Sequence, residues 1–308
     1  MIFLCGIPSE LSLAMVIEEV RKLGVRMVVF NQRQFQKMGI GLKIDGQGVG
    51  GWMQLEGQHY RLEDFTGIYT RLTGYRALPE LETAPDDSPA LQYALSLQDT
   101  MNRWFEIAPG RVLSRNSEIG SNFSKPYQAQ MILRQGFQTP ETLVTNRPEL
   151  VHQFYQKHGR IIYKSISCTR SIVKMLKDED LVRLESICWC PVQFQAYIDG
   201  FNLRVHTVGD EAFATAIRTT AVDYRYAYLK GEKEQLEAVE ISDSLKAKCI
   251  ALSRSLGLEF AGVDLKITPR DEVYCLEVNP CPAFSYYQHY SGQPIAQAVA
   301  KLLVGATS

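Results

Sequence analysis

The segment Val273–Pro282, which reads VYCLEVNPCP, places two polar side chains in a run that begins like a buried strand. Residues two apart on a strand share a face, so Glu277 and Asn279 are expected to project together. A carboxylate buried in a sheet is costly unless it is paired or coordinates a metal. Two interpretations are therefore open: an edge strand with a solvated polar face, or a pair of oxygen ligands for a hard cation.

The segment AGVDLKIT supplies a third oxygen-bearing side chain, Asp264. A turn around Pro269–Asp271 joins its strand to the strand of Glu277 and Asn279, which predicts an antiparallel pair. Magnesium takes oxygen ligands and usually keeps waters and phosphate oxygens, so these three side chains could hold one or two magnesium ions. Pairing of Asp264 with a nearby lysine or arginine is an equal alternative.

Two lysines stand where an anion would stabilise them. Lys164 closes the apolar strand RIIYKS, where a buried ammonium group needs an anionic partner. Lys125 stands just before a helix that is predicted to begin at Pro126, beside free backbone N–H groups and the positive end of the helix dipole. Both lysines are suitable phosphate contacts, and the alternative for each is an ordinary surface lysine.

The segment VQFQAYIDGFNLRVHTVG alternates so that Gln193, Gln195 and Tyr197 share one face of a strand. A strand that leads into a loop can present backbone donors and acceptors to an adenine edge, with a carboxylate such as Asp199 near a ribose. The segment is therefore a candidate nucleotide contact.

Arg204 and Arg218 lie on consecutive predicted strands. Two guanidinium groups suit an oxyanion or a phosphoryl group in transfer. The alternative is that each arginine is half of an ordinary ion pair.

The composition excludes some classes of function. A length of 308 residues is enough for two or three subdomains, and a net charge of −1 argues against a general nucleic-acid surface. No apolar run approaches the roughly 20 residues that span a bilayer, and the N-terminus does not resemble a signal peptide. The seven cysteines are expected to be reduced core thiols of a cytoplasmic protein, with a zinc or redox role for Cys188 and Cys190 as the alternative.

The first third of the chain alternates strands and helices, which predicts an open α/β domain. Its first helix is expected to begin after a Ser9 cap and to end at Gly24. The glycines of Gly46–Gly51 fit neither G-x-G-x-x-G before a helix nor a P-loop, so a hairpin is the expectation. The nucleotide site is expected outside this domain.

The order Lys125, Lys164, VQFQAYIDGFNLRVHTVG, AGVDL and LEVNP resembles the ATP-grasp superfamily, specifically its RimK-like branch of carboxylate–amine ligases. The segments SKPYQAQ and DYRYA are similar to the ligases that crosslink ribosomal peptides. The resemblance covers the chain after about Ser117, and the N-terminal part is similar to the domain that precedes the grasp fold in that family.

The resemblance implies an α/β fold, α+β in its C-terminal part, with an ATP-grasp fold after a small α/β domain. It implies a pre-ATP-grasp domain over 1–118, a lid over 119–195 and a catalytic lobe over 196–308.

The resemblance also implies roles for individual residues. The magnesium ligands are Asp264, Glu277 and Asn279, the residues beside the γ-phosphate and acyl-phosphate are Arg204 and Arg218, and the nucleotide contacts are Lys125, Lys164, Gln193, Gln195, Ala196, Tyr197, Ile198, Asp199 and Asn202. Three features depart from the family pattern. Ala196 and Asn202 stand where acidic residues are usual, and no glycine lies in the loop Ser165–Arg170.

The implied function is an ATP-dependent carboxylate–amine or carboxylate–hydroxyl ligase that works through an acyl-phosphate, on a peptide or an amino acid. The implied cofactor is Mg²⁺, with Mn²⁺ as a substitute, and proteins of this kind are commonly dimers or tetramers. No nucleic-acid or membrane partner is expected. A phosphotransferase on the same fold and a non-catalytic nucleotide-binding module are the alternatives.

Overall fold

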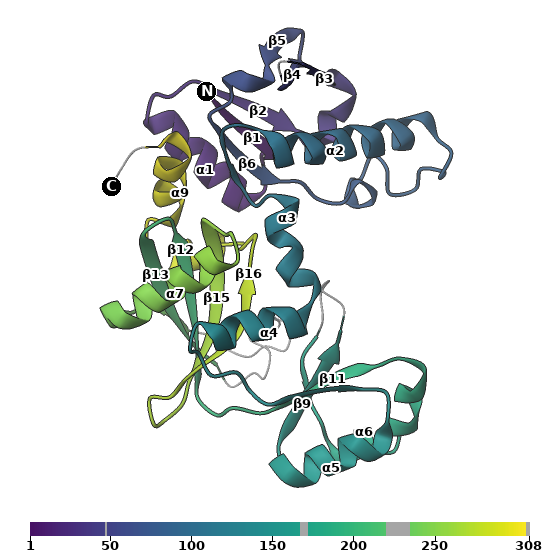
Figure 1. Cartoon of the computed structure of the whole chain (residues 1–308), viewed down its shortest axis with the longest axis vertical. Coiled ribbons are helices and arrows are strands. Elements are labelled where there is room, and N and C mark those ends of the chain that lie inside the picture. Colours follow the sequence, from purple (N-terminus) through teal and green to yellow (C-terminus); the bar gives the residue numbers. More distant parts are fainter. Residues whose placement is uncertain (47, 167–171, 220–234, 306–308) are drawn as a thin grey trace.

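The computed structural model describes residues 1–46, 48–166, 172–219 and 235–305. Figure 1 shows three layers along the long axis: an N-terminal α/β domain, a C-terminal antiparallel sheet in the middle, and a small lid sheet at the other end. No helix in these ranges has both the length and the apolar character needed to cross a membrane.

The N-terminal domain is built on a parallel sheet in the order β2-β1-β6-β7. Its strands are β1 (Ile2–Gly6), β2 (Met27–Asn31), β6 (Gly67–Arg71) and β7 (Arg111–Leu113). Helices α1 (Leu11–Lys22) and α2 (Pro89–Ile107) pack on opposite faces, because Leu4 shares a core with α1 and Phe3 shares one with α2. The predicted strand–helix alternation is confirmed.

The cap of α1 differs from the prediction. The Glu10 carboxylate, rather than Ser9, accepts a hydrogen bond from the backbone N–H of Leu13 at 2.8 Å. A glutamate reaches the first turn here because its carboxylate is also held by Arg71 at 2.8 Å. The tertiary ion pair therefore moves the cap by one residue.

A three-stranded antiparallel sheet extends from this domain, and the predicted hairpin around Gly46–Gly51 is confirmed. Its strands are β3 (Met38–Asp45), β4 (Gly48–Leu55) and β5 (Gln58–Arg61). The indole of Trp52 lies against Gly41, where a Cβ would overlap the ring, and a Cβ on Gly51 would overlap the carbonyl oxygen of Gly41. Glycine is thus used here for close packing of a hairpin and not for a phosphate loop.

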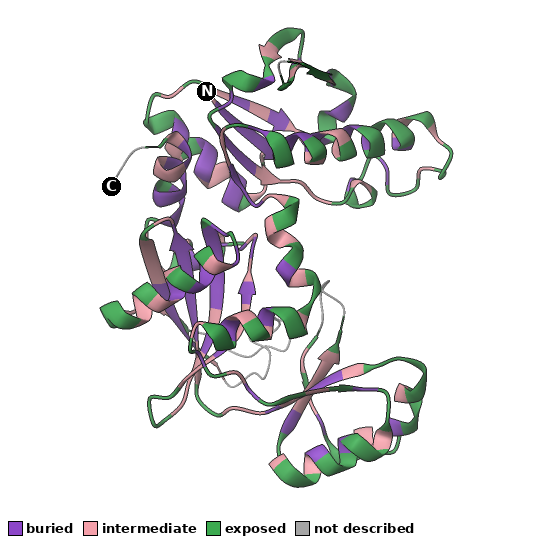
Figure 2. Cartoon of the chain, in the orientation of Figure 1, coloured by how far each residue is buried: buried purple, intermediate pink, exposed green. Residues whose placement is uncertain are grey.

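The C-terminal sheet is antiparallel in the order β14-β13-β12-β15-β16. Its strands are β12 (Phe201–Val208), β13 (Glu211–Arg218), β14 (Gln235–Ala238), β15 (Phe260–Ile267) and β16 (Val273–Asn279). Helices α4 (Lys125–Arg134) and α7 (Asp243–Ser255) share one core with this sheet, through Ile132 and Leu252. Figure 2 shows the strands as the buried part of this layer and the outer sides of α4 and α7 as exposed.

The lid is a smaller antiparallel sheet in the order β10-β9-β11-β8, covered by α5 (Pro148–His158). Its strands are β8 (Thr142–Thr145), β9 (Ile161–Ser165), β10 (Lys174–Met175) and β11 (Val192–Ala196). The short helices of the chain are α3 (Asn116–Ile119), α6 (Asp178–Leu181), η1 (Gln32–Lys37), η2 (Leu62–Asp64), η3 (Tyr75–Ala77), η4 (Gly120–Phe123) and η5 (Leu184–Trp189). Cys188 and Cys190 are exposed on or just after η5, so the expectation of core thiols is wrong for these two.

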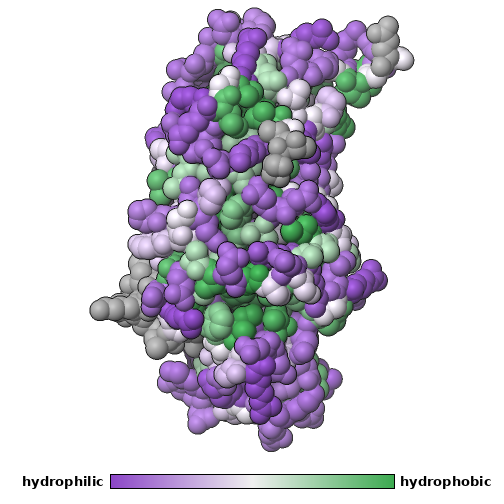
Figure 3. Space-filling model, turned by 90° about the vertical axis from the view of Figure 1, so that its left-hand side faces the viewer, coloured by the Kyte–Doolittle hydropathy of each residue, from purple (hydrophilic) through white to green (hydrophobic). Residues whose placement is uncertain are grey.

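The chain ends in α8 (Ser285–Ser291) and α9 (Ile295–Val304). Figure 1 shows α9 beside α1, and Val299 shares a core with Leu4 of the N-terminal sheet and Phe260 of the C-terminal sheet. The N-terminal domain and the C-terminal sheet are thus joined by continuous apolar packing. Figure 3 shows a mostly hydrophilic surface with hydrophobic patches on the face that it presents.

The expected domain limits of 1–118, 119–195 and 196–308 remain a prediction. The apolar side of α4 packs with the C-terminal sheet, although its residues lie within the range expected for the lid. Helix α4 therefore packs on the C-terminal sheet, although in the chain it directly precedes β8 of the lid.

Candidate functional site

The three expected magnesium ligands lie together on one face of β15 and β16. Asp264 stands directly opposite Glu277 in the antiparallel register, and Gly262 stands opposite Asn279. Residues two apart share a face, so the two carboxylates and the amide project to the same side. The face-sharing expected for Glu277 and Asn279 is present in the fold.

A β-bulge interrupts this register beside the two carboxylates. Leu265 pairs with Cys275, so Leu276 is the extra residue on β16. Val278 is fully buried in the core, whereas Leu276 lines a cavity next to the sheet. Because of the bulge, β16 carries Glu277 and Asn279 on the face shared with Asp264 and also lines the cavity through Leu276.

Each carboxylate is already held by a cation from another element. Arg204 Nη1 on β12 donates to Asp264 Oδ2 at 2.7 Å, and Lys125 Nζ on α4 donates to Glu277 Oε2 at 3.0 Å. The ion pair that the sequence left as an alternative for Asp264 is therefore present. Asn279 Oδ1 accepts from the backbone N–H of Cys281 at 3.2 Å.

Gln128 fixes the helix of Lys125 on the strand of Glu277. Its Nε2 donates to the carbonyl of Val278 at 2.8 Å, and its Oε1 accepts from the N–H of Val278 at 3.0 Å. The sequence analysis did not select Gln128. The available signal was its place in SKPYQAQ, three residues after Lys125 and hence on the same side of the helix.

A cavity of about 320 Å³ lies where α4, the lid and β16 meet. Its walls are Lys125, Pro126, Gln128, Ala129, Ile132, Thr139, Pro140, Glu141, Thr142, Val144, Lys164, Gln193, Gln195 and Leu276. Four of the expected nucleotide contacts are thus brought together: Lys125, Lys164, Gln193 and Gln195. Lys164 stands directly opposite Gln193 on β9 and β11, so these two side chains share the face toward the cavity.

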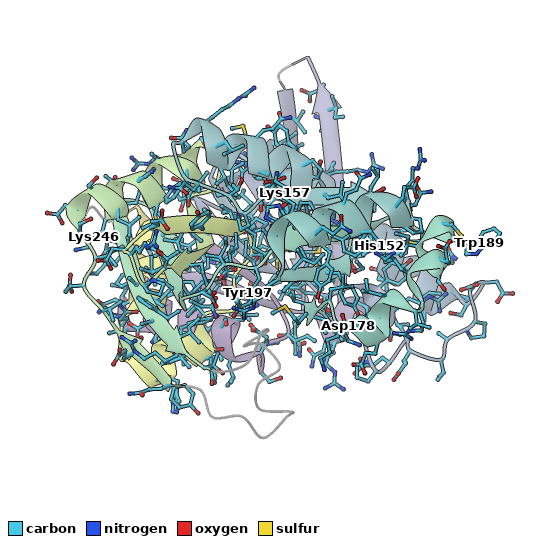
Figure 4. All side chains as sticks on the ribbon, turned by 90° about the horizontal axis from the view of Figure 1, so that it is seen from below. His152, Lys157, Asp178, Trp189, Tyr197 and Lys246 are labelled. Atoms are coloured by element: carbon cyan, nitrogen blue, oxygen red, sulfur yellow. The ribbon has the colours of Figure 1, made fainter. Side chains whose placement is uncertain are left out.

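The segment after β11 is held by backbone hydrogen bonds. The N–H of Ala196 donates to the carbonyl of Glu141 at 2.9 Å, and that of Tyr197 donates to the carbonyl of Arg160 at 3.0 Å. Figure 4 shows Tyr197 where the lid meets the C-terminal sheet, and the Arg160 guanidinium lies 4.2 Å from its ring centroid. These hydrogen bonds hold the backbone of the segment where the chain passes from the lid to the C-terminal sheet.

Several expected nucleotide contacts stand apart from the described cavity walls. Asp199 pairs with Arg160 at 2.8 Å, and Asn202 accepts from Lys266 at 3.3 Å. Neither these two residues nor Ala196, Tyr197 and Ile198 are among those walls. Their roles toward ATP stay predictions.

Arg204 and Arg218 are not brought together. Ile217 stands opposite Asn202, which shares a face with Arg204, so Arg218 projects from the other face of the sheet. Arg218 Nε donates to Glu237 at 3.0 Å, at an exposed position. Residues 167–170 of the loop Ser165–Arg170 and the segment DYRYA, residues 223–227, lie outside the described residues.

His206 is a fully buried polar residue next to Arg204. Arg204 Nε donates to His206 Nε2 at 3.4 Å, and the imidazole meets Tyr287 edge-on with ring centroids 4.8 Å apart. Burial, and secondly the charge of Arg204, hold the pKa of His206 well below its ordinary value. The ring is therefore neutral at physiological pH.

The donor set fits a magnesium ion. Asp264, Glu277 and Asn279 offer only oxygen atoms, which a hard cation prefers, and each ionised carboxylate can accept at more than the one contact described above. Lys125 and Arg204 balance the two negative charges within the protein. A cation bound with phosphate oxygens would be placed at the edge of the cavity.

The class of protein follows from two features of the fold: the antiparallel sheets of the lid and of the C-terminal part, and the cavity with Lys125 and Lys164 that lies where α4, the lid and β16 meet. Residues 124–303 match the model of the RimK-like ATP-grasp domain, so the chain belongs to the RimK-like ATP-grasp family. The expected family, the α/β fold class and the expectation of an ATP-grasp ligase by family are confirmed.

Solved structures share this fold over the whole chain. Macrocyclase MdnC bound with precursor peptide MdnA, from Microcystis aeruginosa MRC, has a TM-score of 0.82 at 23% identity and covers 100% of both chains. ATP-grasp ligase PsnB complexed with minimal precursor, Mg and ADP has a TM-score of 0.80 at 26% identity, over 100% of this chain and 97% of that chain.

A curated relative is similar over a shorter range. A probable alpha-L-glutamate ligase of Pasteurella multocida (strain Pm70) is 25% identical over 213 residues, which are 68% of this chain and 62% of that protein. The match thus spans less than two thirds of the relative.

Proposed function

We propose that the chain is an ATP-dependent ligase that joins a carboxylate to an amine or a hydroxyl through an acyl-phosphate. The observation that carries this proposal is the facing pair Asp264 and Glu277, which adjoins a cavity containing Lys125 and Lys164. A magnesium–nucleotide complex contains both a hard cation and anionic phosphates. Oxygen ligands beside two lysines therefore suit it better than the oxygen ligands or the lysines would alone.

ATP is expected to occupy the cavity between α4, the lid and β16. Lys125 and Lys164 would contact its phosphates, and Gln193 and Gln195 offer amide groups to the base. Leu276 and Ile132 supply apolar walls, as a base requires. The cavity volume of about 320 Å³ lies at the small end of ligand pockets, so the lid is expected to adjust when the nucleotide binds.

Charge neutralisation is the main task of the chain in the first step. A substrate carboxylate oxygen attacks the γ-phosphorus, the bond to the β,γ-bridging oxygen breaks, and ADP leaves. Magnesium held by Asp264, Glu277 and Asn279 would offset charge on the phosphate oxygens. Arg204 and Lys125, which contact Asp264 and Glu277, would stabilise the negative charge that develops on the transferring group.

In the second step an amine or hydroxyl attacks the acyl carbon and inorganic phosphate leaves with the bonding electron pair. The proton of the nucleophile passes to the departing phosphate or to water. No side-chain nucleophile is required. Cys281 therefore needs no covalent role, and its pKa is raised by burial, which disfavours a thiolate.

A peptide is the proposed class of substrate. The similar proteins MdnC and PsnB were solved with precursor peptides, and the Pasteurella relative is named as a glutamate ligase. We infer a peptide carboxylate, such as a glutamate or aspartate side chain, as the activated group. A homo-oligomer, a cytoplasmic location and use of Mn²⁺ are further parts of the proposal.

The test is calorimetry of ATP binding with and without magnesium, followed by assays of ADP and phosphate release with acidic peptides and amines. We expect magnesium-dependent binding that Glu277→Ala abolishes and that Glu211→Gln, a control on β13 of the same sheet, leaves unchanged. Stoichiometric ADP and phosphate with a new amide or ester would support the ligase.

Two other results would contradict the proposal. ADP release with a phosphorylated acceptor and no free phosphate would indicate a phosphotransferase. Binding of ATP without turnover for any acceptor would indicate a nucleotide-binding module.

A further inference from the structure

The guanidinium of Arg204 is held from several directions. Nη1 donates to Asp264 Oδ2 at 2.7 Å, and Nε donates to His206 Nε2 at 3.4 Å. The guanidinium carbon lies 5.6 Å from the centroid of the Tyr287 ring. On another side the group rests on Gly262, where a Cβ would overlap the guanidinium atoms. Contacts at two different nitrogens fix the rotation of the group, not only its position.

The hydrogen bond from Arg204 determines which tautomer the His206 ring adopts. The Nε–H of Arg204 requires a lone pair on His206 Nε2, so the neutral ring carries its proton on Nδ1. His206 is 0% exposed, and Nδ1 has no hydrogen-bond partner in the part of the chain that the structure describes. A buried N–H group without a partner destabilises the fold.

Packing alone therefore does not explain a histidine at this position. A phenylalanine would also meet Tyr287 edge-on and would bury no polar atom. The polar contact that histidine adds is the one to Arg204. Its neighbour Thr207 faces the other side of the sheet and bonds Ser253 Oγ at 2.7 Å, so the two buried polar residues belong to separate networks.

We propose that His206 is a positioning residue for Arg204, and that together with Gly262, whose missing side chain leaves room for the guanidinium, it aims this group at the transferring phosphoryl group. This inference rests on the proposed function, because it assigns Arg204 to the phosphoryl-transfer step. A preorganised cation stabilises charge that develops in the transition state, and displacement by about 1 Å can cost roughly 100-fold in rate.

Three variants separate positioning from packing. His206→Phe keeps an aromatic ring against Tyr287 and removes the acceptor. His206→Gln offers an amide oxygen near the position of Nε2. Thr207→Val is the matched control, since it removes a buried hydrogen bond on the same strand without touching Arg204.

We expect kcat for ADP release to fall by roughly 10- to 100-fold in His206→Phe while KM for ATP changes by less than about 3-fold, because Arg204 acts on the transition state. His206→Gln should restore most of kcat, and Thr207→Val should stay within about 2-fold of the wild type. Gly262→Ala should lower kcat as His206→Phe does, because its Cβ displaces the guanidinium from another side.

A double-mutant cycle shows whether His206 acts through Arg204. In an Arg204→Ala background, His206→Phe should change kcat by less than about 2-fold, since the group that it positions is absent. An equal loss in both backgrounds, or wild-type kcat in His206→Phe, would overturn the proposal.

NMR of the arginine Nε–Hε groups gives a test that needs no turnover. The Arg204 signal, assigned by its loss in Arg204→Lys, should shift and exchange faster with water in His206→Phe, but not in Thr207→Val. An unchanged signal in His206→Phe sinks the positioning role whatever the activity. A shifted signal in a chain that releases no ADP would instead leave the positioning intact and reject the proposed ligase.

Discussion

Asp264 and Glu277 face each other across β15 and β16, and each carboxylate is bound to a cation from a different element. Arg204 reaches Asp264 from the neighbouring strand, while Lys125 reaches Glu277 from a helix 152 positions earlier in the chain. The pairs differ in burial: Arg204 is 4% exposed, and Lys125 and Glu277 are 17% and 24% exposed. The negative charges of Asp264 and Glu277 are thus balanced by the positive charges of Arg204 and Lys125 before any ligand binds.

The difference in burial predicts different stability costs. Asp264→Asn removes the carboxylate charge that pairs with the buried guanidinium of Arg204, and breaking a buried ion pair costs about 3–5 kcal/mol. Glu277→Gln should cost less, because water reaches that pair. Urea unfolding without magnesium measures both, and Asp271→Asn in the exposed turn is the control, expected within about 0.5 kcal/mol of wild type. Equal losses at Asp264 and Glu277 would contradict the ranking.

The lysines of the cavity predict a selective loss of nucleotide affinity. Lys125→Met and Lys164→Met should each raise the dissociation constant for ATP by at least about 10-fold, since each removes a charged phosphate contact. Lys177→Met is the control, because Lys177 is exposed in the lid and pairs with Glu179, and neither residue lines the cavity. Calorimetry at fixed magnesium checks the values. Unchanged affinity in both cavity variants would place the phosphates elsewhere.

Gln128→Leu should destabilise the fold although it adds apolar surface. The variant leaves both the N–H and the carbonyl of Val278 without the partner that they have here, at about 1–3 kcal/mol for each buried group. Gln130→Leu, on the exposed side of the same helix, should be near neutral. The free energy of unfolding in urea measures the difference, and similar values for the two variants would refute the role of Gln128.

We expect His206 to make the free energy of unfolding of the chain depend on pH. Its pKa is held well below the ordinary value by burial, so the unfolded chain binds a proton below about pH 6.5 that the folded chain does not. Its contribution to folding is therefore complete above that pH. As the pH falls toward the folded-state pKa, the free energy of unfolding decreases by up to about 1.4 kcal/mol per unit.

His206→Phe isolates this contribution, because phenylalanine does not titrate. The stability of the wild type relative to this variant should fall between about pH 7.5 and about pH 5.5. Urea unfolding at both values measures the change. A constant difference would show that the imidazole gains its proton as readily in the folded chain as in the unfolded one.

Local patterns were sufficient to predict much of the fold. Alternation of apolar residues predicted the strands around Asp264 and Glu277, and the helix predicted to begin at Pro126 is present as α4, which Ser124 Oγ caps by accepting from the N–H of Tyr127. These features depend on neighbours in the chain, for which a period of two or a cap residue is a direct signal. The Ser9 cap was wrong because Arg71 recruits Glu10 from a distance.

By itself, the sequence determined the elements and the polar residues that they carry, because strand period and turn chemistry act over a few residues. Only the tertiary structure decided which of these residues meet. Arg204 and Arg218 lie on adjacent strands yet point to opposite faces, because the register pairs Ile217 with Asn202. Lys125 reaches Glu277 because Gln128 holds α4 on β16. Such contacts depend on register and helix docking, which arise from the packing of the whole core and leave little trace in local composition.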